Sequence, residues 1–249
     1  MNYEGLQDSY WRIQESRVAR LRNKIDSNVG LAAGRVVPDD EELAIGRGRR
    51  LRMAVRFLDI SGFSGRLSET ESEQEMLLRI LNLFFSEMIK IAEDYGGTVE
   101  RNTGDGLMAY FEDGAGDPPE NGTKRAVASA LTMMAANEYL IGPILFATPV
   151  TPLTFRISID YGVVTVVRLG AARRSNASVA IGATANFASK MLAAQAGDIV
   201  IGDSAKDQLP LHWQIRFTKR VPVETGWIYR STSRPYALYR YTGRWATLV

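Results

Sequence analysis

Two aspartates stand at positions from which their carboxylates could hold a divalent metal ion. Asp59 closes the apolar segment MAVRFLDI and is followed by a Ser-Gly turn, and Asp105 stands between two glycines in RNTGDG. Carboxylates in loops are the usual ligands of Mg²⁺ or Mn²⁺, which keep several waters and accept substrate phosphates. Each aspartate alone also suits a structural role, because Asp59 could cap a helix and aspartate is common in turns. The pair together favours metal-dependent chemistry on a phosphate.

The segments around these aspartates predict a strand, a helix and a hairpin. Residues 53–60 form an apolar, β-leaning run, and apolar residues at helical spacing follow over 73–95. TVER and LMAYF then indicate the two strands of a hairpin around NTGDG. If the first strand and the hairpin lie side by side, their ends bring the two carboxylates together. The turn after Asp59, which contains Gly62 and Phe63, adds backbone N–H groups near a helix N-terminus, where phosphates could rest.

The rest of the chain continues this alternation and predicts an α+β fold, in which helices pack against a mainly antiparallel sheet. The further elements that we expect are a helix over about 123–139, a hairpin of 154–162 and 163–170, a helix over 183–197, and strands over 198–203 and 236–243. The aromatic-rich segment 211–249 is expected to add edge strands that close the core. This pattern indicates one catalytic domain over 51–249, preceded by a helical arm and connector over 1–50.

Composition limits the kinds of protein that this chain can be. Its 249 residues carry 30 basic and 28 acidic side chains, no cysteine and one histidine, His212. These counts exclude a disulfide scaffold and thiolate metal sites, and the near-neutral charge does not favour nucleic acid as a partner. No apolar run approaches the roughly 20 residues of a membrane span, and the N-terminus lacks the apolar core of a signal peptide. We expect a cytoplasmic protein with no direct membrane insertion and no nucleic-acid partner.

Four blocks in the chain resemble, in their order, the catalytic domain of class III nucleotidyl cyclases: FLDISGFS, RNTGDGLMAYF, RISIDYGVV and IGATANFASKM. The resemblance covers about residues 53–203 and implies a ferredoxin-like α+β core that works as a head-to-tail homodimer with two composite active sites. It implies that Asp59 and Asp105 bind two Mn²⁺ or Mg²⁺ ions, with the Ile60 carbonyl as a further ligand. The substrate would be a nucleoside triphosphate, whose ribose 3′-hydroxyl attacks the α-phosphate while pyrophosphate leaves.

The resemblance also assigns roles to one helix, which would serve the active site of the partner copy. Asn186 in TANFASK matches the asparagine that positions the ribose, and Lys190 matches a position usually held by an arginine that stabilises charge on the phosphate. A lysine supplies a point charge instead of a planar fork, so this contact would be geometrically altered. The i, i+4 spacing puts both side chains on one helix face, as a shared site requires. The structural alternative for both residues is a solvated helix face.

The residues that would contact the base differ from those of purine cyclases. Those relatives generally carry a lysine four residues before the second metal aspartate, and an Asp or Thr upstream of the Asn-containing helix; this chain has Arg101 and Val179. Arginine has five donors and no acceptor, and valine cannot accept a hydrogen bond from the exocyclic amine of adenine. The pair suits uracil, which presents two carbonyl oxygens, better than cytosine. The chain thus resembles the pyrimidine cyclases of bacterial anti-phage Pycsar systems, which implies synthesis of cyclic UMP for a separate, cyclic-nucleotide-activated effector.

Three other functions stay open on the sequence alone. They are a cytidylate cyclase that makes cyclic CMP, an adenylate cyclase with an atypical base pocket, and a catalytically dead cyclase-like dimer that regulates a partner. Lys190 in place of arginine favours the dead dimer, whereas the presence of both Asp59 and Asp105 argues against it.

Overall fold

A computed structural model describes most of the chain. The described residues are 30–33, 47–66, 69–100, 105–114, 121–146, 152–168, 178–193, 195–222, 225–229 and 232–245. They belong to two compact units, a larger one of residues 52–164 and 182–249 and a smaller one of residues 1–51 and 165–181. The predicted N-terminal helix lies outside the described residues, so the domain boundary at residue 50 stays a prediction.

The described part of the smaller unit contains short strands paired with the ends of two long ones. Strand β1 (Gly30–Ala33) runs parallel to the first residues of β2 (Arg47–Ile60). Strand β6 (Ser178–Ile181) runs antiparallel to the last residues of β5 (Phe155–Arg168), with Val179 opposite Val167.

The larger unit holds the remaining helices and strands. In chain order they are η1 (Phe63–Gly65), α2 (Glu71–Asp94), β3 (Thr98–Glu100), β4 (Gly106–Glu112), α3 (Gly122–Ala136), the π-helix η2 (Asn137–Ile141), α4 (Gly142–Phe146), α5 (Ala183–Lys190), η3 (Met191–Ala193), β7 (Ile199–Gly202), α6 (Asp203–Gln208), α7 (Leu211–Phe217), β8 (Thr218–Arg220) and β9 (Leu238–Tyr241).

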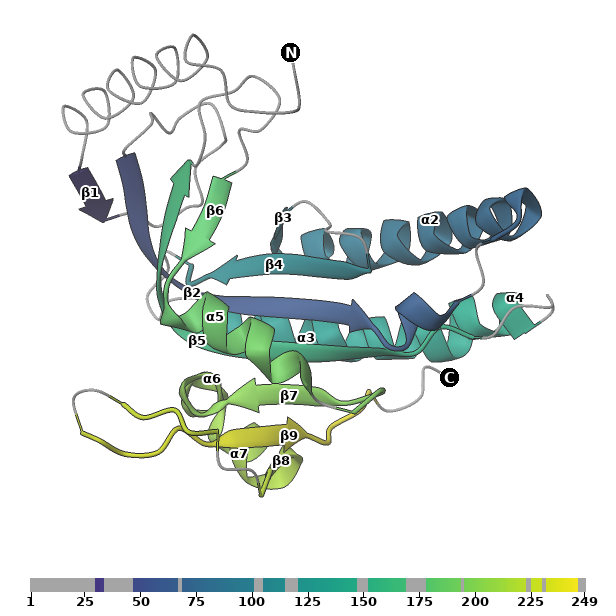
Figure 1. The fold of residues 1–249 in the computed structure, drawn as a ribbon. Coiled ribbons are helices and arrows are strands. Elements are labelled where there is room, and N and C mark those ends of the chain that lie inside the picture. Colours follow the sequence, from purple (N-terminus) through teal and green to yellow (C-terminus); the bar gives the residue numbers. More distant parts are fainter. Residues whose placement is uncertain are drawn as a thin grey trace, which may run out of the picture. The chain divides into compact units, whose positions relative to one another are not determined.

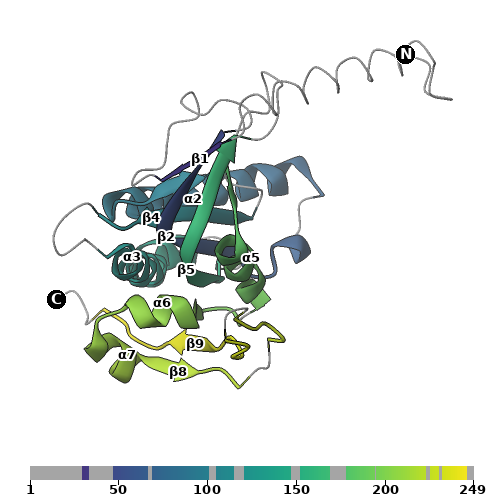
Figure 2. The same cartoon turned by 90° about the vertical axis from the view of Figure 1, so that its left-hand side faces the viewer.

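The sheet order confirms the predicted ferredoxin-like α+β core. Strands follow the order β3-β4-β2-β5-β7-β9-β8, in which the first four form the split β-α-β-β-α-β pattern together with α2 and α3. Helix α3 lies behind the strands and α5 in front of them in Figure 1, and the turned view of Figure 2 separates the same two helices across the sheet. The sheet therefore has one face covered by α2 and α3, and another on which α5 packs.

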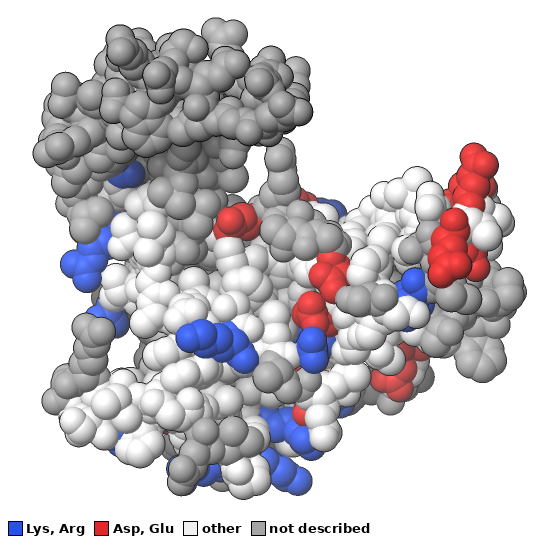
Figure 3. Space-filling view, in the orientation of Figure 1, with Lys and Arg blue, Asp and Glu red and all other residues white. Residues whose placement is uncertain are grey.

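Alternating side chains of β2 and β5 divide between these two faces. Leu58 of β2, Ile157 of β5 and the inner faces of α2 and α3 form one apolar core, in which Phe84 and Phe155 meet edge to face. Helix α2 starts with a complete capping box between Thr70 and Glu73. Acidic side chains gather over its first turns (Figure 3), where they complement the positive end of the helix dipole.

The structure corrects the expected hairpin of residues 154–170. Phe155–Arg168 is one continuous strand, and its antiparallel partner is β6. Gly162, at the boundary between the two expected strands, is instead part of the one strand. A Cβ atom at this position would lie 2.4 Å from Oγ1 of Thr184 at the start of α5. This glycine therefore allows a helix to approach the sheet closely, which is another common reason for glycine in a strand.

The C-terminal region also contains more helix and less strand than expected. Residues 203–208 and 211–217 form the helices α6 and α7, and the strands among the described residues of the region that was expected to close the core are β8 and β9. Trp213 and Phe217 stand one helical turn apart in α7, and both lie within about 6.0 Å of the Tyr241 ring. Among the described residues, no helix combines the length and apolar character needed to cross a membrane.

Candidate active site

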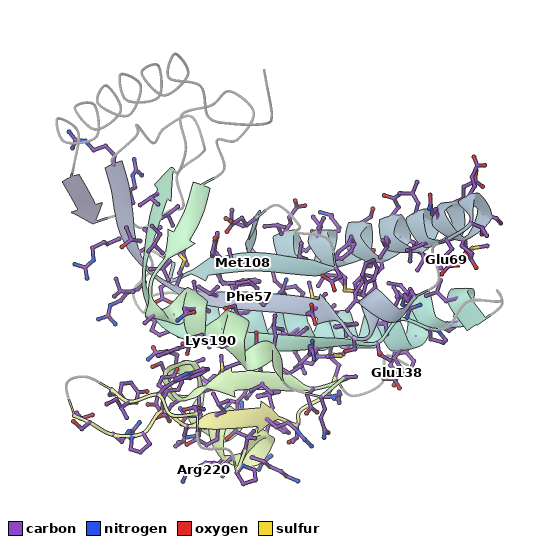
Figure 4. All side chains as sticks on the ribbon, viewed as in Figure 1. Phe57, Glu69, Met108, Glu138, Lys190 and Arg220 are labelled. Carbon is purple, nitrogen blue, oxygen red and sulfur yellow. The ribbon has the colours of Figure 1, made fainter. Side chains whose placement is uncertain are left out.

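The two aspartates predicted to bind metal line one pocket. Strands β2 and β4 pair antiparallel with Asp59 opposite Gly106, so Asp105, the residue before Gly106, lies beside the end of β2. The Ile60 N–H donates to the Asp105 carbonyl oxygen at 3.0 Å and ties the two turns together. The pocket has a volume of about 230 Å³ and is lined also by Phe57, Leu58, Glu100, Gly106, Leu107, Met108, Ser189 and Leu192. Figure 4 labels Phe57 and Met108, which are register partners on the two strands.

The turn that follows Asp59 needs a glycine. Gly62 has φ 66° and ψ 22°, a left-handed conformation that residues with a Cβ rarely adopt. It precedes the short helix η1, whose first residue Phe63 is half-buried against the core. The N–H groups of Ile60, Ser61, Gly65 and Arg66 already donate to backbone carbonyls, so these four groups are not available for contact with a phosphate.

The helix after this turn begins close to where the sequence predicted, two residues before the expected start at residue 73. Helix α2 starts at Glu71 and is capped by Thr70, so Asp59 is not its N-cap. The Ser-Gly turn leads into the short helix η1, so the helix N-terminus nearest to it in the chain is that of η1 and not that of α2. Exclusion of the capping role strengthens the case that Asp59 is a ligand.

Arg156 is a residue of the site that the sequence did not single out. It lies on β5, and its Nε and Nη2 both contact Oδ2 of Asp59, at 2.8 and 2.7 Å. The Arg156 and Asp59 side chains are 31% and 19% exposed, so the pair is only partly screened by water. The alternation of TFRISID could have revealed it, since Arg156, Ser158 and Asp160 share one strand face.

The predicted ribose and phosphate residues lie on α5. Asn186 and Lys190 are both exposed, and their i, i+4 spacing puts them on the same helix face. Neither lines the carboxylate pocket of its own chain, whereas Ser189 and Leu192 from the same region do. Lys190 is labelled on α5 in Figure 4. The two side chains are thus accessible to a second molecule.

The side chains of the two residues predicted to contact the base lie outside the described part of the structure. Arg101 falls within residues 101–104, which lie outside the described part of the chain. Val179 is placed only by its backbone, in β6 opposite Val167. Their predicted role is therefore neither confirmed nor contradicted.

A second, larger cavity of about 540 Å³ lies near α6 and the segment 229–234. Its polar residues are already bonded to neighbours, because Arg234 and the Tyr229 hydroxyl both donate to Oδ2 of Asp203. The Tyr161 hydroxyl, also on this cavity, donates to Asp113 at 2.5 Å while its ring lies in the core. The cavity lacks a carboxylate pair of the kind found on the smaller pocket, at least among its described lining residues.

Comparison with known families identifies the domain. The family model for the adenylate and guanylate cyclase catalytic domain matches residues 48–238. The chain belongs to this family. It therefore carries a nucleotide cyclase catalytic domain of class III, as the four sequence blocks predicted. Divalent metal ions are the general cofactors of such cyclases, in agreement with a pocket lined by two carboxylates.

Individual relatives agree with this assignment. The adenylate cyclase of Anabaena cylindrica is 30% identical over 155 residues, which are 61% of this chain and 29% of that protein. The chain thus spans less than a third of that relative's length. The adenylyl cyclase CyaB from P. aeruginosa has 29% identity and a TM-score of 0.62, covering 81% of this chain and 99% of that one. The guanylyl cyclase Cya2 shares the fold, at 22% identity and a TM-score of 0.63, over 79% of this chain and 94% of that one.

Proposed function

We propose that this cyclase domain converts UTP to cyclic UMP and pyrophosphate, at sites shared between two copies of a head-to-tail homodimer. The observation that carries the reaction is the strand register that sets Asp59 opposite Gly106 and brings both carboxylates to one pocket. The family match supports the reaction type. The relatives are named adenylate or guanylyl cyclases, so the choice of a pyrimidine rests on Arg101 and Val179 of this chain.

The carboxylate pocket fits divalent cations. Asp59 and Asp105 supply the anionic oxygen donors that Mn²⁺ and Mg²⁺ prefer, and the Ile60 carbonyl would add a neutral one. No cluster of three or more His, Cys, Asp or Glu side chains suited to a metal occurs within the described ranges, so waters and phosphate oxygens would complete the coordination. When bound, two such ions would lower the pKa of the ribose 3′-hydroxyl and offset charge on the triphosphate.

Arg156 would change partners when substrate enters. In the free protein its guanidinium group compensates the charge of Asp59 through two contacts to a single oxygen. A cation bound to that oxygen competes with the guanidinium group, and a triphosphate brings anionic oxygens that match its planar donors. Arg156 would then bind a phosphate oxygen and leave Asp59 to the metal.

Asn186 and Lys190 would act on the substrate held by the partner copy. Both are exposed on α5 and neither lines the pocket of its own chain. Asn186 would orient the ribose, so that the 3′-hydroxyl stands in line with the α-phosphate. Lys190 would stabilise the charge that develops on the phosphate.

Arg101 and Val179 would select the base. Arginine offers only donors, which match the O2 and O4 carbonyls of uracil, and valine offers no acceptor for an exocyclic amine. Cytosine keeps one carbonyl, so CTP is the next candidate substrate. The cyclic nucleotide would serve as a messenger in the cytoplasm that activates a separate effector in anti-phage defence.

A nucleotide panel tests this proposal. Purified protein is incubated separately with ATP, GTP, CTP and UTP in the presence of Mn²⁺, and products are identified by mass spectrometry. Cyclic UMP as the main product is the expected result, and the Asp59→Ala variant serves as the control for contaminating cyclases. Cyclic CMP would correct the base assignment, and cyclic AMP would refute the pyrimidine proposal. A lack of product from every nucleotide would refute the enzyme assignment for the isolated chain.

Mixed dimers test the shared site. An Asp105→Ala chain and an Asn186→Ala chain are each expected to be inactive alone. A heterodimer of the two contains one site with intact carboxylates and an intact α5, so activity should return to about half of the wild-type value per dimer. A purified heterodimer that stays inactive would contradict the head-to-tail arrangement.

A further inference from the structure

Helix α5 is held by an aromatic cluster from the C-terminal region. Phe187, between the two predicted catalytic residues in sequence, stacks on Trp227 with ring centroids 4.6 Å apart and an interplanar angle of 9°. The Tyr236 ring lies 5.1 Å from Phe187 on the same cluster. We call Phe187, Trp227 and Tyr236 the aromatic clamp. Its rings connect the active-site helix to a segment about forty residues further along the chain.

The clamp is anchored to the sheet through Tyr236. The Tyr236 hydroxyl donates to Oδ1 of Asp160, and both side chains are buried, with 4% and 1% exposure. The same hydroxyl accepts a hydrogen bond from the Ser204 N–H at 3.3 Å. The Tyr236 N–H donates to the Trp227 carbonyl at 2.8 Å, which fixes the two rings of the C-terminal segment relative to each other. The clamp therefore links α5 to β5 and α6 through direct contacts.

Helix α5 depends on such contacts for its orientation. It has only eight residues, and the residue before it, Gly182, has no side chain with which to cap it. A helix of this length is unstable in isolation, so tertiary packing must hold it. Further attachments include the Ser158 hydroxyl, which donates to the Ala188 carbonyl at 2.6 Å, and the close approach of Thr184 to Gly162.

We infer that Trp227 and Tyr236 are positioning residues for catalysis, which act through Phe187 to aim Asn186 and Lys190 at substrate in the partner copy. This inference rests on the proposed shared site. Catalysis is sensitive to such aim, since a displacement of about 1 Å can cost about 10²-fold in rate. Loss of the clamp should therefore lower kcat while the carboxylate pocket stays intact.

Trp227→Leu is the variant that tests the clamp. We expect its homodimer to fold and to lose about 10- to 100-fold in kcat, with the Mn²⁺ concentration for half-maximal activity unchanged. Trp227→Phe, which keeps an aromatic ring, should recover most of the activity. Trp245→Leu is the matched control, because Trp245 also lies in the C-terminal region but bonds to Thr132, on α3, at 2.8 Å. This control should keep the wild-type kcat.

Mixed dimers separate positioning from general destabilisation. A Trp227→Leu chain paired with an Asp105→Ala chain forms one site with intact carboxylates and an intact α5, so activity should rise to the level of the Asp105→Ala and Asn186→Ala pair. Paired with an Asn186→Ala chain, it should stay low, because both chains then carry a defective α5. If Trp227→Leu does not fold, Tyr236→Phe, which removes only a hydroxyl, replaces it in the same two pairings.

The outcomes distinguish the two proposals. Wild-type kcat in the Trp227→Leu homodimer would overturn the inference, as would equal rescue by both partner chains. Failure of the Asp105→Ala and Asn186→Ala pair itself would instead refute the shared site on which the inference rests.

Discussion

Arg56 and Asp59 are charged residues three positions apart on the same strand, and they face opposite sides of the sheet. Arg56 is fully buried beneath α3, where its Nη1 donates to the Ser129 hydroxyl and its guanidinium lies 5.1 Å from the centre of the Phe111 ring. Its Nε and Nη2 have no hydrogen-bond partner within the described part of the chain. Asp59 is partly exposed and has Arg156 as its counter-ion.

The comparison shows that burial decides whether a charged side chain is available for chemistry. Burial lowers the pKa of the Arg56 guanidinium to about 9, which reflects the cost of keeping this cation in the core. Asp59 keeps access to solvent and a partner that a metal ion can displace. The same two-residue alternation of β2 therefore sends one charge to the core and the other to the pocket. The four predictions below test this difference, from the largest expected effect to the smallest.

Removal of either pocket carboxylate should nearly abolish turnover. Asp59→Ala and Asp105→Ala are each expected to lower kcat by at least about 10³-fold, because the cations lose an anionic ligand. Circular dichroism should show an unchanged fold, since both residues lie at the rim of the core and not in it. A variant with substantial residual activity would contradict the metal assignment.

Asp160 is a buried charge on β5, and it should make stability depend on pH. Burial raises the pKa of the Asp160 carboxyl to about 7, although the hydrogen bond from Tyr236 opposes this. The folded protein then binds one more proton than the unfolded chain between about pH 4 and pH 7, so stability falls as pH rises through this range. We expect a loss on the order of 3 kcal/mol relative to the Asp160→Asn variant.

Denaturant unfolding of both proteins across pH 4 to 8 measures this effect. The Asn variant keeps an acceptor for the Tyr236 hydroxyl but has no carboxyl at position 160 to titrate, so it serves as the control for the wild-type protein. Parallel stability curves for the two proteins would show that Asp160 does not titrate in this range.

Replacement of Arg156 should lower activity less than loss of either carboxylate, but more than replacement of a surface residue. Arg156→Gln removes the counter-ion of Asp59 and the proposed phosphate contact, and we expect about a 30-fold loss in kcat/KM for the nucleotide. Arg156→Lys should recover only part of this loss, because lysine lacks the planar fork. Steady-state kinetics at saturating Mn²⁺ provides the measurement, and wild-type values for the Gln variant would rule out a role in the site.

Replacement of Arg56 should increase stability and leave activity unchanged, whereas replacement of Arg156 should lower activity. Arg56→Met removes a buried charge that lacks a carboxylate partner among the described residues, and we expect the free energy of unfolding to rise by about 1–2 kcal/mol. Ser129 keeps a hydrogen bond to the Ala126 carbonyl at 2.8 Å and is not left unsatisfied. Thermal and denaturant unfolding test this, with unchanged kcat as the control. A destabilised Met variant would show that the guanidinium contacts outweigh the cost of burial.

The amino-acid sequence alone determined the order of elements from β2 to α3 and the identity of the pocket aspartates. The apolar period of α2, the glycines that flank Asp105 and the Ser-Gly turn after Asp59 are local signals, because each reflects the conformation of a few neighbouring residues. Four such blocks in order sufficed for the family, which the match over residues 48–238 confirms.

Only the tertiary structure decided the contacts between distant segments. The register of Asp59 with Gly106, the pairing of Arg156 with Asp59, and the packing of Trp227 on Phe187 join residues that lie far apart in the chain. Gly162 is the clearest example: a glycine by itself suggests a turn, whereas here it lies within β5 and leaves room for Thr184, more than twenty residues away. Local sequence propensity cannot predict such contacts, because they form only when distant segments of the chain come together on folding.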